Sequence, residues 1–120
     1  ETVALVTEAR RRDLRTVVTH AAFWIPVGVQ QQLAALGAFI EQVGGPTLRA
    51  GGDEAAENIL DQVRSVGAQQ VILSTDLGQA ANPDPPYGFG RWIHRALDAG
   101  FSSDEVGCMV RENPERLLAA

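Results

Sequence analysis

Three polar residues, His20, Glu41 and Asp76, each stand at the carboxyl end of a short apolar or β-branched run. If these runs form neighbouring parallel strands, the side chains share the edge of the sheet at which parallel α/β proteins bind ligands. An imidazole and carboxylates are side chains that hold divalent metal ions such as zinc. We therefore expect a metal site with His20 and Asp76 as ligands. A metal-activated water would attack a carbonyl group there, and Asp76 would take up its proton.

Each of these residues also has a purely structural interpretation. His20 could cap its strand through a hydrogen bond to a neighbouring loop, and Glu41 could pair with an arginine. Asp76 precedes a glycine-containing loop and could stabilise its own turn, as aspartates do. A shared site requires these side chains to lie close together, whereas three separate structural roles do not.

Two aromatic residues, Phe23 and Trp24, follow shortly after His20. They could line a pocket beside the expected site, or they could cover the end of the core. Glu41 and Trp24 are accordingly candidates for an additional ligand or for a pocket residue.

The other residues with reactive side chains are few. His94 lies opposite the apolar stripe of its predicted helix, so we expect it on the surface, and Cys108 is expected to pack in the core. A single cysteine excludes an internal disulfide and is compatible with the reducing cytoplasm, where we expect the protein. The chain has no lysine, which excludes a Schiff base, a P-loop lysine and a carbamylated lysine between two metals.

Charge and hydropathy exclude two classes of partner. The formal net charge is −5 and the isoelectric point is about 4.9, whereas nucleic-acid binding needs clustered basic residues. The only basic run, Arg10-Arg11-Arg12, is followed by Asp13 and is interpreted as a solvated helix face. No apolar run approaches the ~20 residues that a membrane-spanning helix needs.

The elements that would position the candidate residues alternate along the chain. Helices are predicted over residues 2–13, 28–36, 53–66, 87–99 and from 103 onward, strands over residues 15–20, 38–41 and 69–75, and loops over residues 21–27 and 77–86. Asp53 is expected to cap one helix, Ser102 with Glu105 to form a capping box, and Pro114 to open the last helix. This order predicts an α/β protein built from parallel β/α units.

Larger α/β architectures are only partly represented. A complete TIM barrel needs eight β/α units in ~250 residues, and this chain holds three predicted strands. No G-x-G-x-x-G follows a predicted strand, so there is no dinucleotide-binding fingerprint.

Three stretches of the chain carry a resemblance to a known family. They are Val17-Val18-Thr19-His20, Ile72-Leu73-Ser74-Thr75-Asp76-Leu77-Gly78, and the ending from Gly100-Phe101-Ser102 to Asn113-Pro114-Glu115-Arg116-Leu117-Leu118. Together they resemble the C-terminal part of the TIM-barrel metal-dependent hydrolases of the amidohydrolase superfamily. The closest likeness is to a poorly characterised branch whose last strand reads Ser-Thr/Ser-Asp-Leu-Gly-Gln.

The resemblance implies a single partial-barrel domain over residues 1–120, equivalent to the last three strands of a (β/α)8 barrel. It implies that His20 binds a divalent metal, zinc, and that Asp76 both binds this metal and acts as the general base. It implies no role for Glu41. The His-x-His pair of the family's first strand and the ligand of its central strands have no counterpart here, so we expect the chain alone to be inactive.

The same resemblance bears on partners. Three parallel strands taken from a barrel leave unpaired edges and an apolar face, and the runs at 17–18 and 71–73 show no polar alternation. We therefore expect self-association as a homodimer, or association with the missing N-terminal half of the barrel. The alternative function is a non-catalytic, barrel-derived α/β module that self-associates or binds a partner.

Overall fold

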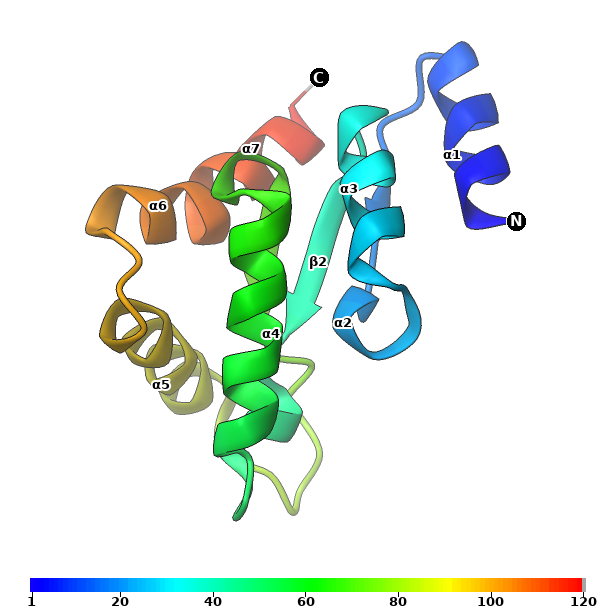
Figure 1. Ribbon diagram of the computed structural model, residues 1–120. Helices are drawn as coiled ribbons and strands as arrows, with labels where there is room; N and C mark the ends of the chain where they lie inside the picture. Colours follow the sequence, from blue (N-terminus) through cyan, green and yellow to red (C-terminus); the bar gives the residue numbers. More distant parts are fainter. Residues whose placement is uncertain (120) are drawn as a thin grey trace.

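A computed structural model describes residues 1–119 and shows a three-stranded parallel sheet flanked by helices (Figure 1). The strands β1 (Val17–Val18), β2 (Phe39–Val43) and β3 (Val71–Ser74) lie side by side in that order. Helical segments connect each strand to the next, because parallel neighbours need a crossover connection. The predicted α/β class with parallel strands is confirmed.

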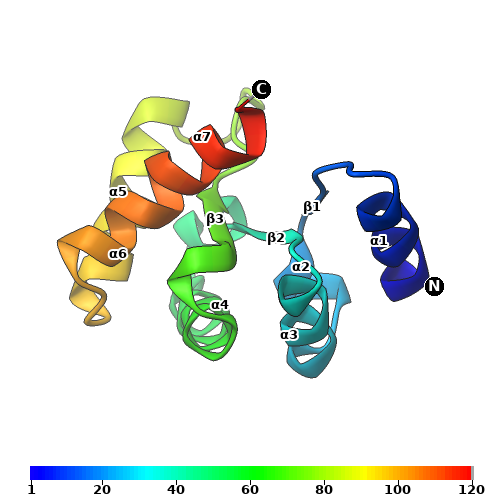
Figure 2. The same ribbon diagram turned by 90° about the horizontal axis from the view of Figure 1, so that it is seen from above.

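The helices account for most of the remaining chain. They are α1 (Thr2–Arg11), α2 (Ala21–Trp24), α3 (Val27–Ala35), α4 (Asp53–Val66), α5 (Pro85–Asp98), α6 (Ser103–Gly107) and α7 (Asn113–Leu118), with short 3-10 turns η1 (Gly45–Leu48) and η2 (Ala68–Gln70) and a π-helical segment η3 (Cys108–Glu112). Figure 2 shows α3 and α4 on one side of the sheet, α5 to α7 gathered beside β3, and α1 beside β1. Across residues 1–119, every helix is too short or too polar to cross a bilayer.

The main core lies between the sheet and the helices that cover it. Ile40 of β2 pairs with Val18 of β1 and with Val71 of β3. Side chains alternate along a strand, so Ile40 and Gln42 face one side while Phe39, Glu41 and Val43 face the other. The buried apolar cluster includes Leu33, Ile40, Ile59, Leu60, Val63, Val71, Leu73, Trp92, Phe101 and Met109.

The opposite side of the sheet is covered over β2 and β3 and open over β1. Phe39, Val43 and Ile72 are buried, and the guanidinium group of Arg116 lies 5.2 Å from the centre of the Phe39 ring. Val17, on the edge strand, is 44% exposed. The apolar face expected to lie uncovered is therefore reduced to the β1 edge.

Two segments predicted as loops contain helix. The stretch after His20 forms the single turn α2. Helix α5 begins at Pro85, inside the predicted loop. A proline is tolerated in the first helical turn because the N–H that it lacks would have no intrahelical partner there. Helix α4 is preceded by Gly52 as its N-cap, so Asp53 is the first helical residue rather than the cap. The capping box of Ser102 with Glu105 is confirmed.

Candidate metal-binding edge of the sheet

His20 stands where β1 turns into α2, in an unusual backbone conformation. Its φ is 54°, in the left-handed region, and it occupies the N-cap position of α2 without a side-chain capping bond. A left-handed residue other than glycine costs about 1 kcal/mol. Such a residue persists where surrounding contacts hold it, and these positions cluster at functional sites.

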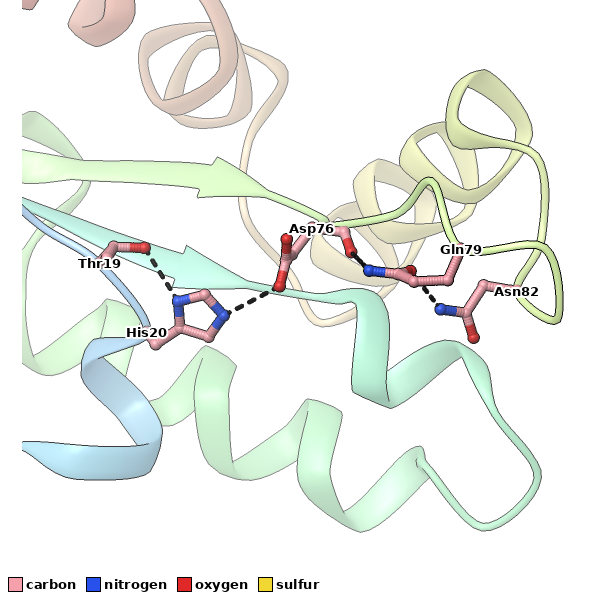
Figure 3. A network of polar contacts seen from close by, with 5 residues as sticks. All are labelled: Thr19, His20, Asp76, Gln79 and Asn82. Atoms are coloured by element: carbon pink, nitrogen blue, oxygen red, sulfur yellow. Dashed lines mark hydrogen bonds and ion pairs between the residues drawn. The ribbon is translucent and has the colours of Figure 1, made fainter.

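Asp76 repeats this arrangement at the end of β3. It follows the strand by two residues and also has φ 54°. The side-chain amide of Gln79 donates to the Asp76 carbonyl oxygen at 3.1 Å, and Asn82 Nδ2 donates to Gln79 Oε1 at 2.5 Å (Figure 3). These bonds hold the loop that carries the Asp76 carboxylate.

The two side chains meet across the carboxyl end of the sheet, as the sequence predicts. His20 Nε2 lies 3.2 Å from Asp76 Oδ2, and Thr19 Oγ1 lies 3.1 Å from His20 Nδ1 (Figure 3). The side chains of His20 and Asp76 are 37% and 63% exposed, so solvent reaches both. Asp76 Oδ1 makes no hydrogen bond to residues 1–119 and stays open to a ligand or a water.

The hydrogen bonds allow two protonation arrangements of this pair. If the Thr19 hydroxyl donates to Nδ1, then Nε2–H donates to the Asp76 carboxylate. If Nδ1–H donates to Thr19, the lone pair of Nε2 faces a carboxylate oxygen, and a positive charge must lie between them. A proton or a metal cation would supply that charge.

The spacing of the pair agrees with two positions on one metal ion. Two ligands of a tetrahedral zinc stand about 3.4 Å apart, because zinc–nitrogen and zinc–oxygen bonds are each about 2.1 Å long. The 3.2 Å between Nε2 and Oδ2 is close to that value. A catalytic zinc takes three protein ligands, and residues 1–119 contain no cluster of three or more His, Cys, Asp or Glu side chains placed to hold an ion. The spacing of the pair is compatible with two ligands of one ion, and residues 1–119 place no third such side chain beside them.

Glu41 is not brought together with His20 and Asp76. Strand β2 continues to Val43, so Glu41 lies in the middle of the strand rather than at its end, where the sequence predicts it. It pairs with Ile72, and alternation places its half-buried side chain on the face of Phe39 and Val43. A polar residue does not end a strand when the backbone beyond it continues to pair.

Trp24 lines a pocket, but not one shared with the His20–Asp76 pair. Its side chain is 79% exposed and Phe23 is 42% exposed, so neither covers the core. Both border a groove of about 570 Å³ between α2 and α4. The polar residues of this groove are Asn58, Asp61, Gln62 and Ser65.

The remaining reactive side chains lie where the sequence predicts them. His94 is exposed on α5. Cys108 is buried, and its thiol lies 3.4 Å from Asn113 Oδ1. Burial, with a contribution from the Glu112 carboxylate, raises the pKa of the Cys108 thiol. The thiol packs in the core, as the sequence predicts.

The pair has supporting residues for which the sequence gives little direct signal. Thr19 fixes the imidazole orientation, and its only sequence signal is that it precedes His20. Gln42 is fully buried next to the His20 turn. Its signal is an amide on the face of β2 that also carries the apolar Ile40.

Comparison of the chain with family models, with curated proteins and with solved structures gave no match.

Proposed function

We propose that this chain supplies part of the active site of a metal-dependent hydrolase of the amidohydrolase type. His20 and Asp76 would be two ligands of a divalent metal, zinc, and Asp76 would also be the general base. The observation that supports this proposal is the 3.2 Å contact between His20 Nε2 and Asp76 Oδ2 at the carboxyl edge of a parallel sheet. Ligands gather at this edge in α/β proteins.

The side chains of the pair have separate tasks in this proposal. His20 would hold the ion through its imidazole, whose contact with Thr19 helps to direct the ring at Asp76. Asp76 would hold it through its carboxylate, and this carboxylate would also take up a proton from water. A divalent ion held there would supply the Lewis acid that hydrolysis of an amide or ester needs.

The ligand set would be completed outside the residues described. Further strands of a barrel, or a second copy of the chain, are the two sources of the additional ligands. We therefore expect the chain alone to bind zinc weakly, with a dissociation constant in the micromolar range or above, and to show little or no hydrolase activity.

The proposal is tested by calorimetric titration of zinc into the chain and its variants. His20→Gln and Asp76→Asn should each weaken zinc binding about tenfold or more, because each removes one of two ligands. His94→Gln, on the exposed face of α5, and Asp84→Asn, in the loop before α5, are matched controls and should leave the affinity unchanged. Equal zinc affinity in all five proteins would exclude the pair as ligands.

A second candidate function is a non-catalytic module that self-associates or binds a partner. It is supported by exposed apolar side chains near the free β1 edge, where Leu14 is 59% and Val17 is 44% exposed. An edge strand offers unpaired backbone groups to another strand. Light scattering behind size-exclusion chromatography should show a dimer that Val17→Lys converts to a monomer, and a wild-type monomer at tens of micromolar would contradict this candidate.

A further inference from the structure

Three glutamine side chains from three different elements meet behind the His20 turn. We call Gln42 of β2, Gln30 of α3 and Gln62 of α4 the amide network. Gln42 Nε2 donates to Gln30 Oε1 at 2.8 Å, and Gln30 Nε2 donates to Gln62 Oε1 at 2.6 Å. Gln30 and Gln42 are both 0% exposed. Burying an amide is unfavourable unless it is hydrogen-bonded, so the network needs its partners.

Those partners include the backbone of α2. Gln42 Oε1 accepts the Ala22 N–H at 2.9 Å, Gln30 Nε2 lies 2.8 Å from the Ile25 carbonyl oxygen and 3.3 Å from that of Ala21, and Gln62 Nε2 lies 3.5 Å from the Ala22 carbonyl oxygen. An isolated single helical turn is not stable in water. His20 provides no side-chain cap for α2, so the turn is held against the sheet by the amide network together with the burial of Ala21 in the core.

The position of α2 decides the direction of the His20 imidazole. His20 directly precedes the turn, and its left-handed backbone is not the conformation that the residue prefers. If α2 were released, the backbone at His20 would relax and its Cα–Cβ bond would point elsewhere. The contact of Nε2 with Asp76 depends on that bond direction, since Asp76 comes from a strand 56 residues further along the chain.

We propose that the amide network positions His20 for its contact with Asp76, with Gln42 as the central positioning residue. Gln42 is the member that bonds the Ala22 N–H, two residues after His20. The inference rests on the proposed function in one respect only, that the pair is the functional site. The positioning itself is a property of the apoprotein and is measurable without metal.

The test observes the imidazole rings of the wild-type chain by ¹H–¹⁵N nuclear magnetic resonance. The chain has two histidines, so His94 is an internal reference, and His94→Gln assigns the signals. In Gln42→Met, which removes the amide at similar volume, the His20 ring resonances should move to the positions they take in Asp76→Asn. The His94 resonances should stay in place.

A matched substitution separates positioning from a general loss of stability. Gln70 is a glutamine that is partly buried, as Gln62 is, and its amide bonds the carbonyl oxygens of Ala34 and Ala38, which precede β2. Gln70→Met should lower the melting temperature without moving the His20 resonances. If it moves them as far as Gln42→Met does, the positioning role is overturned.

The milder variant Gln62→Met keeps the test decisive if Gln42→Met does not fold. It removes the outer end of the amide network and should move the His20 resonances in the same direction by a smaller amount. Unchanged His20 resonances in a folded Gln42→Met, or in Gln62→Met if Gln42→Met is unfolded, refute the inference. Failure of wild type to bind zinc refutes the proposed function instead and leaves these shifts unaffected.

Discussion

The two ends of β3 both carry polar side chains, in opposite environments. At the start of the strand, Asn113 is 0% exposed and donates to the carbonyl oxygens of Ala68 and Val71 at 2.7 and 2.6 Å. Beyond its end, the Asp76 side chain is 63% exposed and bonds only His20 among the side chains of residues 1–119. One end is closed and fully bonded, and the other is open with unused bonding capacity.

The backbone shows the same contrast. Asn113 has φ −65° and ψ −45°, a regular helical conformation, whereas His20 and Asp76 are both left-handed. Polar groups that are buried and satisfied stabilise a fold, and exposed groups in strained backbone are the ones available for chemistry. The closed end of β3 therefore stabilises the fold, and the open end is where we propose that a ligand binds.

The largest expected effect comes from breaking the closed end. Asn113→Ala should lower the free energy of unfolding by about 3 kcal/mol, because two buried carbonyl groups lose their donor. Urea denaturation measures this change. Asn82→Ala, which removes an amide from the open end, should cost less than about 0.5 kcal/mol. Similar losses in both variants would contradict the contrast.

A smaller effect is expected from the contact that supports the Asp76 loop. A Cβ at Gly45 would overlap the backbone carbonyl oxygen of Thr75. Gly45→Ala should therefore lower the free energy of unfolding by about 2 kcal/mol and displace Asp76 from His20. At Gly90 a Cβ meets no atom within 4 Å. Gly90→Ala should raise the free energy of unfolding by about 0.5–1 kcal/mol, because alanine is favoured over glycine in the interior of a helix such as α5. Thermal melts and the His20 ring resonances report both effects.

The strain at the open end is measurable by comparing two substitutions that both remove the imidazole. His20→Gly should be more stable than His20→Ala by about 1 kcal/mol, since only glycine accepts the left-handed backbone without cost. At Glu57, within helix α4, the alanine variant should instead be more stable than the glycine variant by about 1 kcal/mol. If alanine is the more stable residue at both positions, the backbone at His20 is not strained.

The smallest effect concerns pH at the closed end. The folded protein raises the pKa of Cys108 above its ordinary value of 9.0, so it favours the neutral thiol. This contribution to stability is complete below that ordinary value and is lost as the pH rises through the raised one. The free energy of unfolding, measured by urea denaturation from about pH 7 to about pH 10.5, should fall more in wild type than in Cys108→Ala. The difference should be less than about 1 kcal/mol. Parallel curves would contradict the prediction.

Sequence patterns were sufficient for the parallel strands and for the convergence of His20 and Asp76. Apolar runs separated by amphipathic helices require crossovers, and crossovers place His20 and Asp76 at one edge. The patterns did not reveal that β2 runs past Glu41, because strand length depends on pairing with β3. They also did not reveal α2, whose single turn is held by side chains from distant elements rather than by its own helix propensity. Resemblance to a barrel hydrolase remains a proposal.

The π-helical segment η3, which joins α6 to α7, lets the closed end lose one residue that a regular helix could not lose. A π-turn holds one more residue than an α-helical turn, so deleting a single residue between Cys108 and Glu112 would let α6 and α7 merge into one regular helix. Each residue of an α-helix advances by about 100°, but the extra residue of a π-turn is taken up within the wider turn, so this deletion would leave Asn113 facing Ala68 and Val71. A frame-preserving loss of one codon in this segment would thus be less damaging than the same loss within α6, which would turn Asn113 by about 100° relative to the residues before it.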